Sequence, residues 1–141
     1  MIAVDTNVLV YAHRPEAPHH ETARAALESL AGSRWAIPWP CVHEFLAVVT
    51  NGRVFATPTP PGIALMAIKA AKDAGAAFMT EAGDHLDRLA SLLESSGTTG
   101  AKVHDARVAA ICLSNGVTEL WTADRDFGYF PQLRTRNPLV S

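Results

Sequence analysis

MIAVDTNVLVY, residues 1–11, is the stretch around which the rest of the chain is organised. Residues 2–4 (IAV) are typical of a short buried strand, and Asp5 follows them without a spacer. A carboxylate at the end of a buried strand costs free energy unless a cation or several hydrogen-bond donors meet it. Asp is also a favoured N-cap, so a helix that begins at Asn7 or Val8 would explain Asp5 without any chemistry. The other acidic residues decide between these interpretations.

The composition is that of an ordinary globular protein. Of 141 residues, 48% are apolar and 18% are charged, which excludes a disordered chain and predicts a single domain over residues 1–141. The N-terminus lacks the basic segment of a signal peptide, and no apolar run is long enough to cross a membrane. We therefore expect a cytoplasmic protein in which Cys41 and Cys112 are buried thiols. The net charge of −2 gives no overall basic field that would indicate nucleic acid.

Strand patterns alternate with helix patterns along the chain, which predicts a three-layer α/β/α sandwich with a central, mostly parallel sheet. The expected strands cover residues 2–4, 35–37, 76–79 and 117–122, and residues 128–141 hold at most one short edge strand. The expected helices cover residues 7–12, 19–30, about 41–49, 63–74, 83–95 and 102–113. Right-handed crossovers then bring the carboxyl ends of the strands to one edge of the sheet.

Acidic residues from four separate segments are expected at that edge. Asp5 and Asp124 follow strands, Glu44 and Asp105 lie in the first turns of helices, and Asp126 is close to Asp124. Each one alone is explained by a helix N-terminus or a turn. Together they would repel one another unless a divalent cation neutralised them, and oxygen ligands favour Mg²⁺ or Mn²⁺ over zinc. Such a site often activates water against a phosphodiester.

These segments resemble the motifs of PIN-domain ribonucleases. Residues 5–11 (DTNVLVY) are similar to the opening motif of that family, and residues 41–45 (CVHEF) to the segment of its second acid. Residues 104–110 (HDARVAA) resemble the third motif, and residues 122–127 (TADRDF) the fourth. Length and motif order are similar to those of VapC-like toxins from bacterial toxin–antitoxin pairs, although residues 57–100 contribute no motif.

The resemblance implies an endoribonuclease that cleaves single-stranded or looped RNA with metal-activated water. Asp5, Glu44, Asp105 and Asp124 would be the catalytic residues and would hold Mg²⁺ or Mn²⁺, and Asp126 would be an auxiliary acid. The polar residues expected to orient carboxylates or water are Thr6, Asn7 and Thr122. The resemblance also implies a homodimer and a small antitoxin protein that wraps the toxin and blocks the acidic residues.

Several other residues leave alternatives open. Arg107 and Arg125 are candidate phosphate contacts, but ion pairs with the neighbouring acids explain them equally well. Trp35 and Trp39 flank a buried strand and are expected in the core rather than on a base-stacking surface. The helix at residues 63–74 is apolar on nearly every side, so it is buried or covered by a partner, and we favour the partner.

Three rival functions remain to be weighed. A phosphotransferase of the haloacid-dehalogenase type needs a second acid two residues after the first, where Asn7 stands. A receiver domain needs an Asp after its third strand, but no acid occurs between Glu44 and Asp73. A non-catalytic PIN-like module that binds RNA or protein would usually lack one of the acids, and none is missing here.

Overall fold

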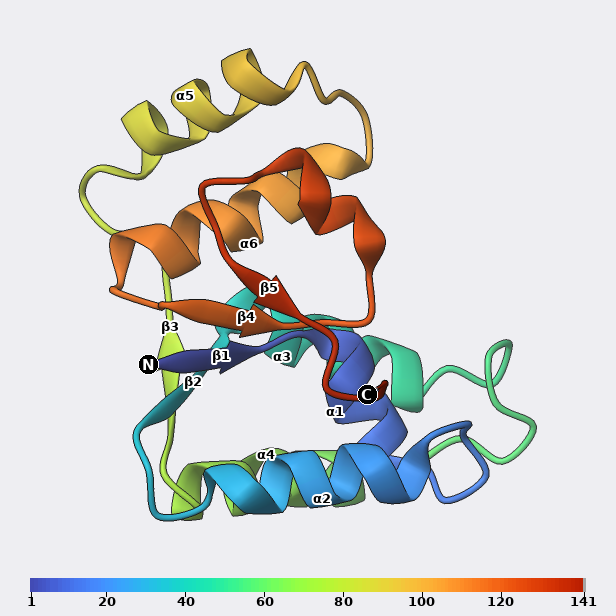
Figure 1. The fold of residues 1–141 in the computed structure, drawn as a ribbon. Coiled ribbons are helices and arrows are strands. Elements are labelled where there is room, and N and C mark those ends of the chain that lie inside the picture. The colour runs from blue at the N-terminus through green and yellow to red at the C-terminus, as the bar shows by residue number, and fades with distance from the viewer. Residues whose placement is uncertain (141) are drawn as a thin grey trace.

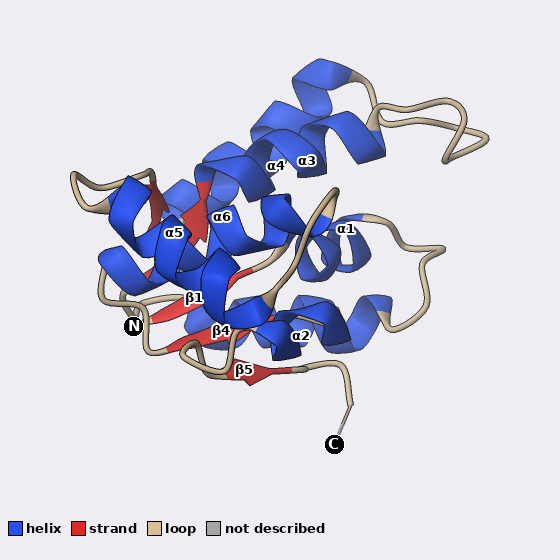
Figure 2. Ribbon diagram, turned by 90° about the horizontal axis from the view of Figure 1, so that it is seen from above, coloured by secondary structure: helices blue, strands red, loops and turns tan. Residues whose placement is uncertain are grey.

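The computed structural model describes residues 1–140, which form a five-stranded sheet flanked by six α-helices (Figures 1 and 2). The strands are β1 (Ile2–Val4), β2 (Trp35–Pro38), β3 (Ala76–Met79), β4 (Glu119–Trp121) and β5 (Thr135–Arg136). The helices are α1 (Thr6–His13), α2 (His20–Leu30), α3 (Trp39–Val49), α4 (Pro61–Asp73), α5 (His85–Ser96) and α6 (Lys102–Ser114), with a 3₁₀ helix η1 at Arg125–Tyr129.

The sheet is parallel throughout, with the strand order β3-β2-β1-β4-β5. The chain moves outward from β1 through β2 to β3, and then returns to the other side of β1 for β4 and β5. The strand order therefore reverses beside β1, and such reversals are the places where open parallel sheets bind ligands. Asp5 lies at this point, and its backbone N–H donates to the carbonyl of Trp121 at 2.9 Å.

Helices cover both faces of the sheet. Figure 1 shows α5 and α6 on one side, and α2 and α4 on the other. Figure 2 shows β5 at the outer edge, next to β4. The largest side chains of the core come from β2, α3 and the segment after η1, and include Trp35, Phe45 and Phe130. The predicted three-layer α/β/α architecture is confirmed, and its parallel strands direct their carboxyl ends to one edge.

The start of α3 differs from the prediction. The helix begins at Trp39 rather than near Cys41, because Pro40 occupies the first turn, where a missing N–H leaves no hydrogen bond unmade. Trp35 is buried as expected, and its indole N–H donates to the carbonyl of Ala74 at 3.1 Å. Trp39 is 40% exposed, so the prediction that it belongs to the core is wrong. Its place in the first turn of α3 puts it beyond the end of the buried strand.

Helix α4 is only partly covered. Ala64 and Ile68 are buried, whereas Ile63, Leu65 and Met66 are between 46% and 62% exposed. The core therefore accounts for one side of this helix and leaves an apolar surface on the other. Within the described part of the chain, no helix has the length and apolarity needed to cross a membrane.

Candidate active site

Asp5 is buried at the junction of β1 and α1. Its Oδ1 accepts a hydrogen bond from the backbone N–H of Thr6 at 2.8 Å, so Asp5 does cap α1. Its Oδ2 accepts a hydrogen bond from the hydroxyl of Thr122 at 2.7 Å, and the thiol of Cys41 donates to Oδ1 at 3.4 Å. A helix cap requires only the first of these contacts, so capping alone does not explain how Asp5 is held.

The surroundings of Asp5 disfavour its negative charge. Burial raises the pKa of Asp5 above its ordinary value, while the hydrogen bonds from Thr122 and Thr6 act in the opposite direction. The charge of Glu44 raises this pKa further. Among residues 1–140, no Lys or Arg forms an ion pair with Asp5. A buried carboxylate in this situation favours a bound cation.

Hydroxyl groups and one amide connect the acids to one another. Thr6 donates from Oγ1 to Glu44 at 3.1 Å. Thr122 donates to Asp5, and its Oγ1 accepts from the backbone N–H of Asp124 at 2.9 Å. The amide of Asn7 accepts from the backbone N–H of residue 123 at 3.1 Å and lies 3.4 Å from the Thr122 hydroxyl. These contacts are the kind that the sequence predicted for Thr6, Asn7 and Thr122.

Three further carboxylates form a close cluster. One oxygen from each of Asp105, Asp124 and Asp126 lies within 4.8 Å of the others. Desolvation raises the pKa of Asp105 to about 6, with additional contributions from the charges of Asp124, Asp5 and Asp126. Asp126 therefore lies close to Asp105 and Asp124, and its auxiliary role stays a prediction. Glu44 is outside this group of three but lines two cavities together with Asp5 and Asp105.

Lys102, which the sequence analysis did not identify, lies beside this cluster. Its Nζ lies 2.6 Å from a carboxylate oxygen of Asp126. Lys102 stands three residues before Asp105 in α6, and residues at this spacing share one face of a helix. This spacing could have indicated that Lys102 lies near the acids, but not that it pairs with Asp126. Lys102 compensates Asp126, which leaves Asp105 and Asp124 without an ion pair in the described part of the chain.

The two arginine candidates do not pair with the neighbouring acids. Arg107 forms an ion pair with Glu81 at 3.1 Å rather than with Asp105. Arg125 is exposed and has no ion pair within residues 1–140. The prediction that Arg107 and Arg125 form ion pairs with the neighbouring acids is therefore wrong. Both guanidinium groups are accessible from solvent.

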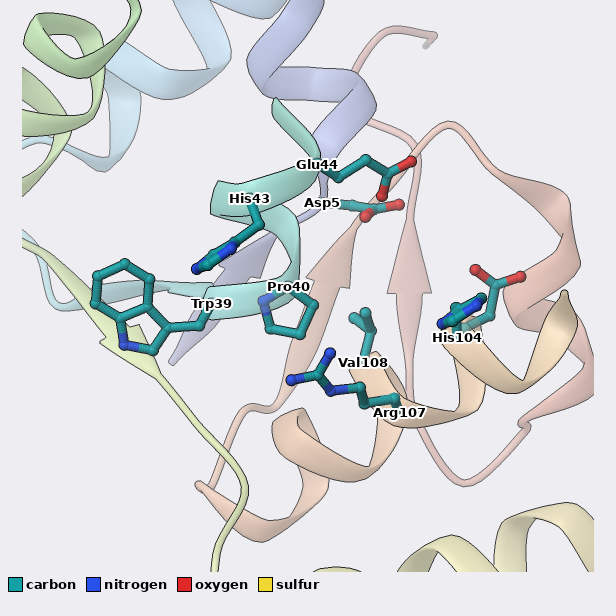
Figure 3. A pocket seen from close by; sticks show the side chains of 9 residues that line it. Asp5, Trp39, Pro40, His43, Glu44, His104, Arg107 and Val108 are labelled. Carbon is teal, nitrogen blue, oxygen red and sulfur yellow. The ribbon is translucent and has the colours of Figure 1, made fainter. Parts of the chain in front are cut away.

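Three cavities meet at the acids. One is lined by Glu44, Lys102, Asp105 and Asp126 among others. The other two are both lined by Asp5, Glu44 and Asp105. Of these two, the first has a volume of about 280 Å³, and its other lining residues are Trp39, Pro40, His43, His104, Arg107 and Val108 (Figure 3). The second has a volume of about 240 Å³, and its other lining residues are Thr6, Asn7, Val10, Tyr11, Val48 and Asp124. Asp5, Glu44 and Asp105 therefore lie between these two cavities, an arrangement that suits an extended polymer as substrate.

The donors at this edge fit a hard divalent cation. Asp5 is buried without a compensating side-chain cation, and three more carboxylates lie within ligand distance of one another. These donors are all oxygen atoms, which Mg²⁺, Mn²⁺ and Ca²⁺ prefer, whereas zinc sites usually include His or Cys. The acidic cluster is therefore suited to a metal ion.

Comparison with known proteins agrees with this geometry. The PIN domain pattern matches residues 2–132. The chain is 40% identical to VapC ribonuclease Mb2897 of Mycobacterium bovis, over 99% of this chain and 96% of that protein. It is 31% identical to ribonuclease VapC31 of Mycobacterium tuberculosis, over 98% of this chain and 99% of that protein.

Solved structures show the same fold at low sequence identity. VapBC2 from Rickettsia felis, bound to a promoter DNA fragment, has a TM-score of 0.70 at 19% identity and covers 97% of this chain and 98% of that one. Mycobacterium tuberculosis VapC20, described as a sarcin–ricin loop cleaving toxin, has a TM-score of 0.67 at 16% identity and covers 91% and 93%. The resemblance drawn from the four motifs is confirmed, and the chain belongs to the PIN domain family.

Proposed function

We propose that this protein is the toxin of a toxin–antitoxin pair and acts as an endoribonuclease that requires Mg²⁺ or Mn²⁺. The observation that carries the proposal is the convergence of acids from four separate segments: Asp5, Glu44 and Asp105 line both cavities, and Asp124 lines the second. Only Lys102 forms an ion pair with an acid of this cluster in the described part of the chain, and that acid is Asp126. The remaining negative charge supports a divalent cation as the missing partner.

Asp5, Glu44, Asp105 and Asp124 are the residues proposed to hold the ion, with Asp126 beside them. When bound, the ion would lower the pKa of water and stabilise the negative charge that develops on a phosphodiester. The protein itself keeps the carboxylates in place through the hydroxyls of Thr6 and Thr122 and the amide of Asn7, as supporting residues do in metal sites.

Hydrolysis by water also agrees with the state of the nearby cysteine. The Cys41 thiol is buried against Asp5, and burial and the negative charge of Asp5 raise the pKa of Cys41 well above its usual range. A thiol that stays protonated is a poor nucleophile. We therefore assign Cys41 a structural role as a weak hydrogen-bond donor to Asp5.

The proposed substrate is single-stranded or looped RNA. The two cavities are open to solvent and share Asp5, Glu44 and Asp105 in their lining. Unpaired nucleotides enter such cavities more readily than a stacked duplex does. Arg107 lines the first cavity and Arg125 is exposed near Asp124, so both remain proposed phosphate contacts. The curated relatives are named ribonucleases, and VapC20 is described as cleaving the sarcin–ricin loop, which supports this substrate class.

We further propose a homodimer and a cognate antitoxin as partners, both in the cytoplasm. The exposed apolar residues of α4 supply a surface that would gain from being covered. Several similar structures are toxin–antitoxin complexes, which supports an antitoxin here. Light scattering of the purified protein tests the dimer, and co-purification with the product of a short neighbouring reading frame tests the antitoxin.

RNA cleavage tests the enzyme directly. Purified protein should cleave total RNA in Mg²⁺ or Mn²⁺ and stop when EDTA is added. Asp105→Asn should lower the rate by at least about 100-fold, because metal-assisted charge stabilisation contributes several kcal/mol. Asp73→Asn is the matched control, since Asp73 is exposed at the end of α4 and lines neither cavity. If Asp105→Asn cleaves like the control, the active-site assignment is wrong; if the wild type binds RNA without cleaving it, the protein is a non-catalytic PIN module.

A further inference from the structure

Trp39 presents a partly exposed indole beside the acids. It is 40% exposed, whereas Trp35, four residues earlier, is 1% exposed. The Trp39 ring is fixed by two neighbours, with its centroid 4.9 Å from that of Phe78 and 6.0 Å from that of His43. An indole held this way keeps an accessible surface while losing little conformational freedom on binding.

The exposed indole belongs to a cavity that ends at the acids. Figure 3 shows Trp39 at one end of the first cavity, and Asp5 and Glu44 together at another. Arg107 extends from α6 toward the side of the cavity that Trp39 occupies (Figure 3). Its guanidinium group is partly exposed and forms an ion pair with Glu81 at 3.1 Å.

The chemistry of this lining fits a flat, polar, aromatic ligand. Unpaired nucleobases stack on aromatic side chains and on guanidinium planes, and every base offers a face for such stacking. The imidazole rings of His43, in α3, and His104, in α6, are both exposed and offer hydrogen-bonding nitrogens on different sides of the cavity (Figure 3). A volume of about 280 Å³ is at the small end for ligand pockets, which suits one base rather than several.

We propose that this cavity binds one unpaired nucleobase, stacked on Trp39, from the nucleotide next to the phosphate held at the acids. The inference rests on the proposed ribonuclease function and deepens it. A base in this cavity has left the stack of a helix, so the protein selects unpaired RNA by the base as well as by access. The second cavity, which Tyr11 lines, receives the strand on the other side of the acids.

Fluorescence tests the stacking without any variant. The probes are a short single-stranded RNA and an oligomer of the same length and charge that lacks bases, both made with a backbone that resists hydrolysis and added with Mg²⁺, so that a phosphate can bind at the acids. Trp39 is far more exposed than Trp35 or Trp121, so quenching of tryptophan emission reports mainly on Trp39. The RNA should quench the emission and the abasic oligomer should not. Equal quenching by both probes would overturn the proposal.

Kinetics separate stacking from packing. Trp39→Leu should raise KM for RNA cleavage about 5- to 150-fold, the range for loss of one stacked base, and leave kcat within a few-fold. Trp39→Phe keeps an aromatic ring and should recover most of the loss. Leu86→Ala is the control, since Leu86 is an apolar residue of α5 that is 77% exposed and lines neither cavity.

The outcomes distinguish this inference from the proposed function. An unchanged KM in Trp39→Leu, together with an inactive Asp105→Asn, would overturn the base site and leave the ribonuclease standing. Quenching that depends on the base, in a wild type that cleaves no RNA, would support the base site and overturn the ribonuclease. Equal losses in Trp39→Leu and Trp39→Phe would mean that Trp39 serves packing alone, which also overturns the proposal.

Discussion

Asp5 and Asp105 line the same cavities in opposite surroundings. Asp5 is buried and accepts hydrogen bonds from Thr6, Thr122 and Cys41. Asp105 is half-buried, has no hydrogen bond from residues 1–140 to its carboxylate, and lies beside Asp124 and other acids. The position of Asp5 is therefore set by folding, whereas the Asp105 side of the site is a concentration of charge that folding leaves uncompensated.

The contrast between Asp5 and Asp105 shows how a metal site can hold one ligand in place before binding and still carry uncompensated charge that attracts a cation. The hydrogen bonds around Asp5 fix one carboxylate before any ion binds, which lowers the entropy that binding would otherwise cost. Burial of Asp105, together with repulsion from Asp124, Asp5 and Asp126, disfavours its negative charge in the metal-free protein and so favours binding of a cation. Substitutions on the two sides should therefore change stability in opposite directions.

The largest effect on stability is expected on the Asp5 side. Thr122→Val keeps the shape of the buried side chain but removes the donor to Asp5 and the acceptor for the backbone N–H of Asp124. Because hydrogen bonds to charged groups contribute about 1.5–3 kcal/mol, the variant should lose about 2 kcal/mol of unfolding free energy. Urea denaturation of metal-free protein measures this loss.

The matched control for that variant is Thr135→Val. Thr135 is exposed in β5, and none of the side-chain hydrogen bonds within residues 1–140 involves it, so its replacement should change stability by less than about 0.5 kcal/mol. Similar losses in Thr122→Val and Thr135→Val would mean that the hydrogen bonds at Asp5 add nothing beyond an ordinary surface contact.

The next effect concerns pH on the Asp105 side. The pKa of Asp105 is raised to about 6, so the folded metal-free protein binds a proton more tightly than the unfolded chain does. Unfolding free energy should therefore fall as pH rises from about 4 through 6, and should stay low at pH 7. Mg²⁺ or Mn²⁺ should restore stability at pH 7 through binding to the folded state.

Asp105→Asn isolates this contribution from the histidines, which titrate in the same range. At pH 7, the metal-free variant should be more stable than wild type by about 1 kcal/mol, a figure reduced for the solvent exposure of this carboxylate. Its stability should depend less on pH between 4 and 6. Thermal unfolding in EDTA at a series of pH values measures both quantities, and parallel profiles for the two proteins would contradict the proposed repulsion.

The sequence was sufficient to predict the order of strands and helices and the edge of the sheet where the acids lie. Buried strands and helices with clear apolar periodicity gave the alternating order of elements, and parallel strands necessarily bring residues such as Asp5 and Asp124 to one edge. Boundaries moved where local chemistry was ambiguous. Pro38 and Pro40 suggested a break after β2, but Pro40 is accommodated in the first turn of α3, which begins at Trp39.

The sequence was insufficient where long side chains choose among several partners. Arg107 stands two residues from Asp105 but reaches Glu81, which is far away in the sequence. Lys102 reaches Asp126 across the gap between α6 and η1. Such contacts depend on the three-dimensional path of the chain rather than on spacing, so charge pairs were the least predictable part of the site. The exposure of Trp39 was missed for a different reason: α3 begins at Trp39, which places this residue beyond the end of the buried strand.

The smallest expected effect is a change in metal affinity when Lys102, on the Asp105 side of the site, is replaced. Lys102 compensates Asp126, so Lys102→Met should leave more uncompensated negative charge around Asp105 and Asp124. Because exposed ion pairs are weak and screened by solvent, Mn²⁺ should bind at most about fivefold more tightly, measured by titration calorimetry. Lys72→Met, at the exposed end of α4, is the control and should leave the affinity unchanged. Weaker binding in Lys102→Met would mean instead that Lys102 positions Asp126 as a ligand, and the exposed side would then be as preorganised as the buried one.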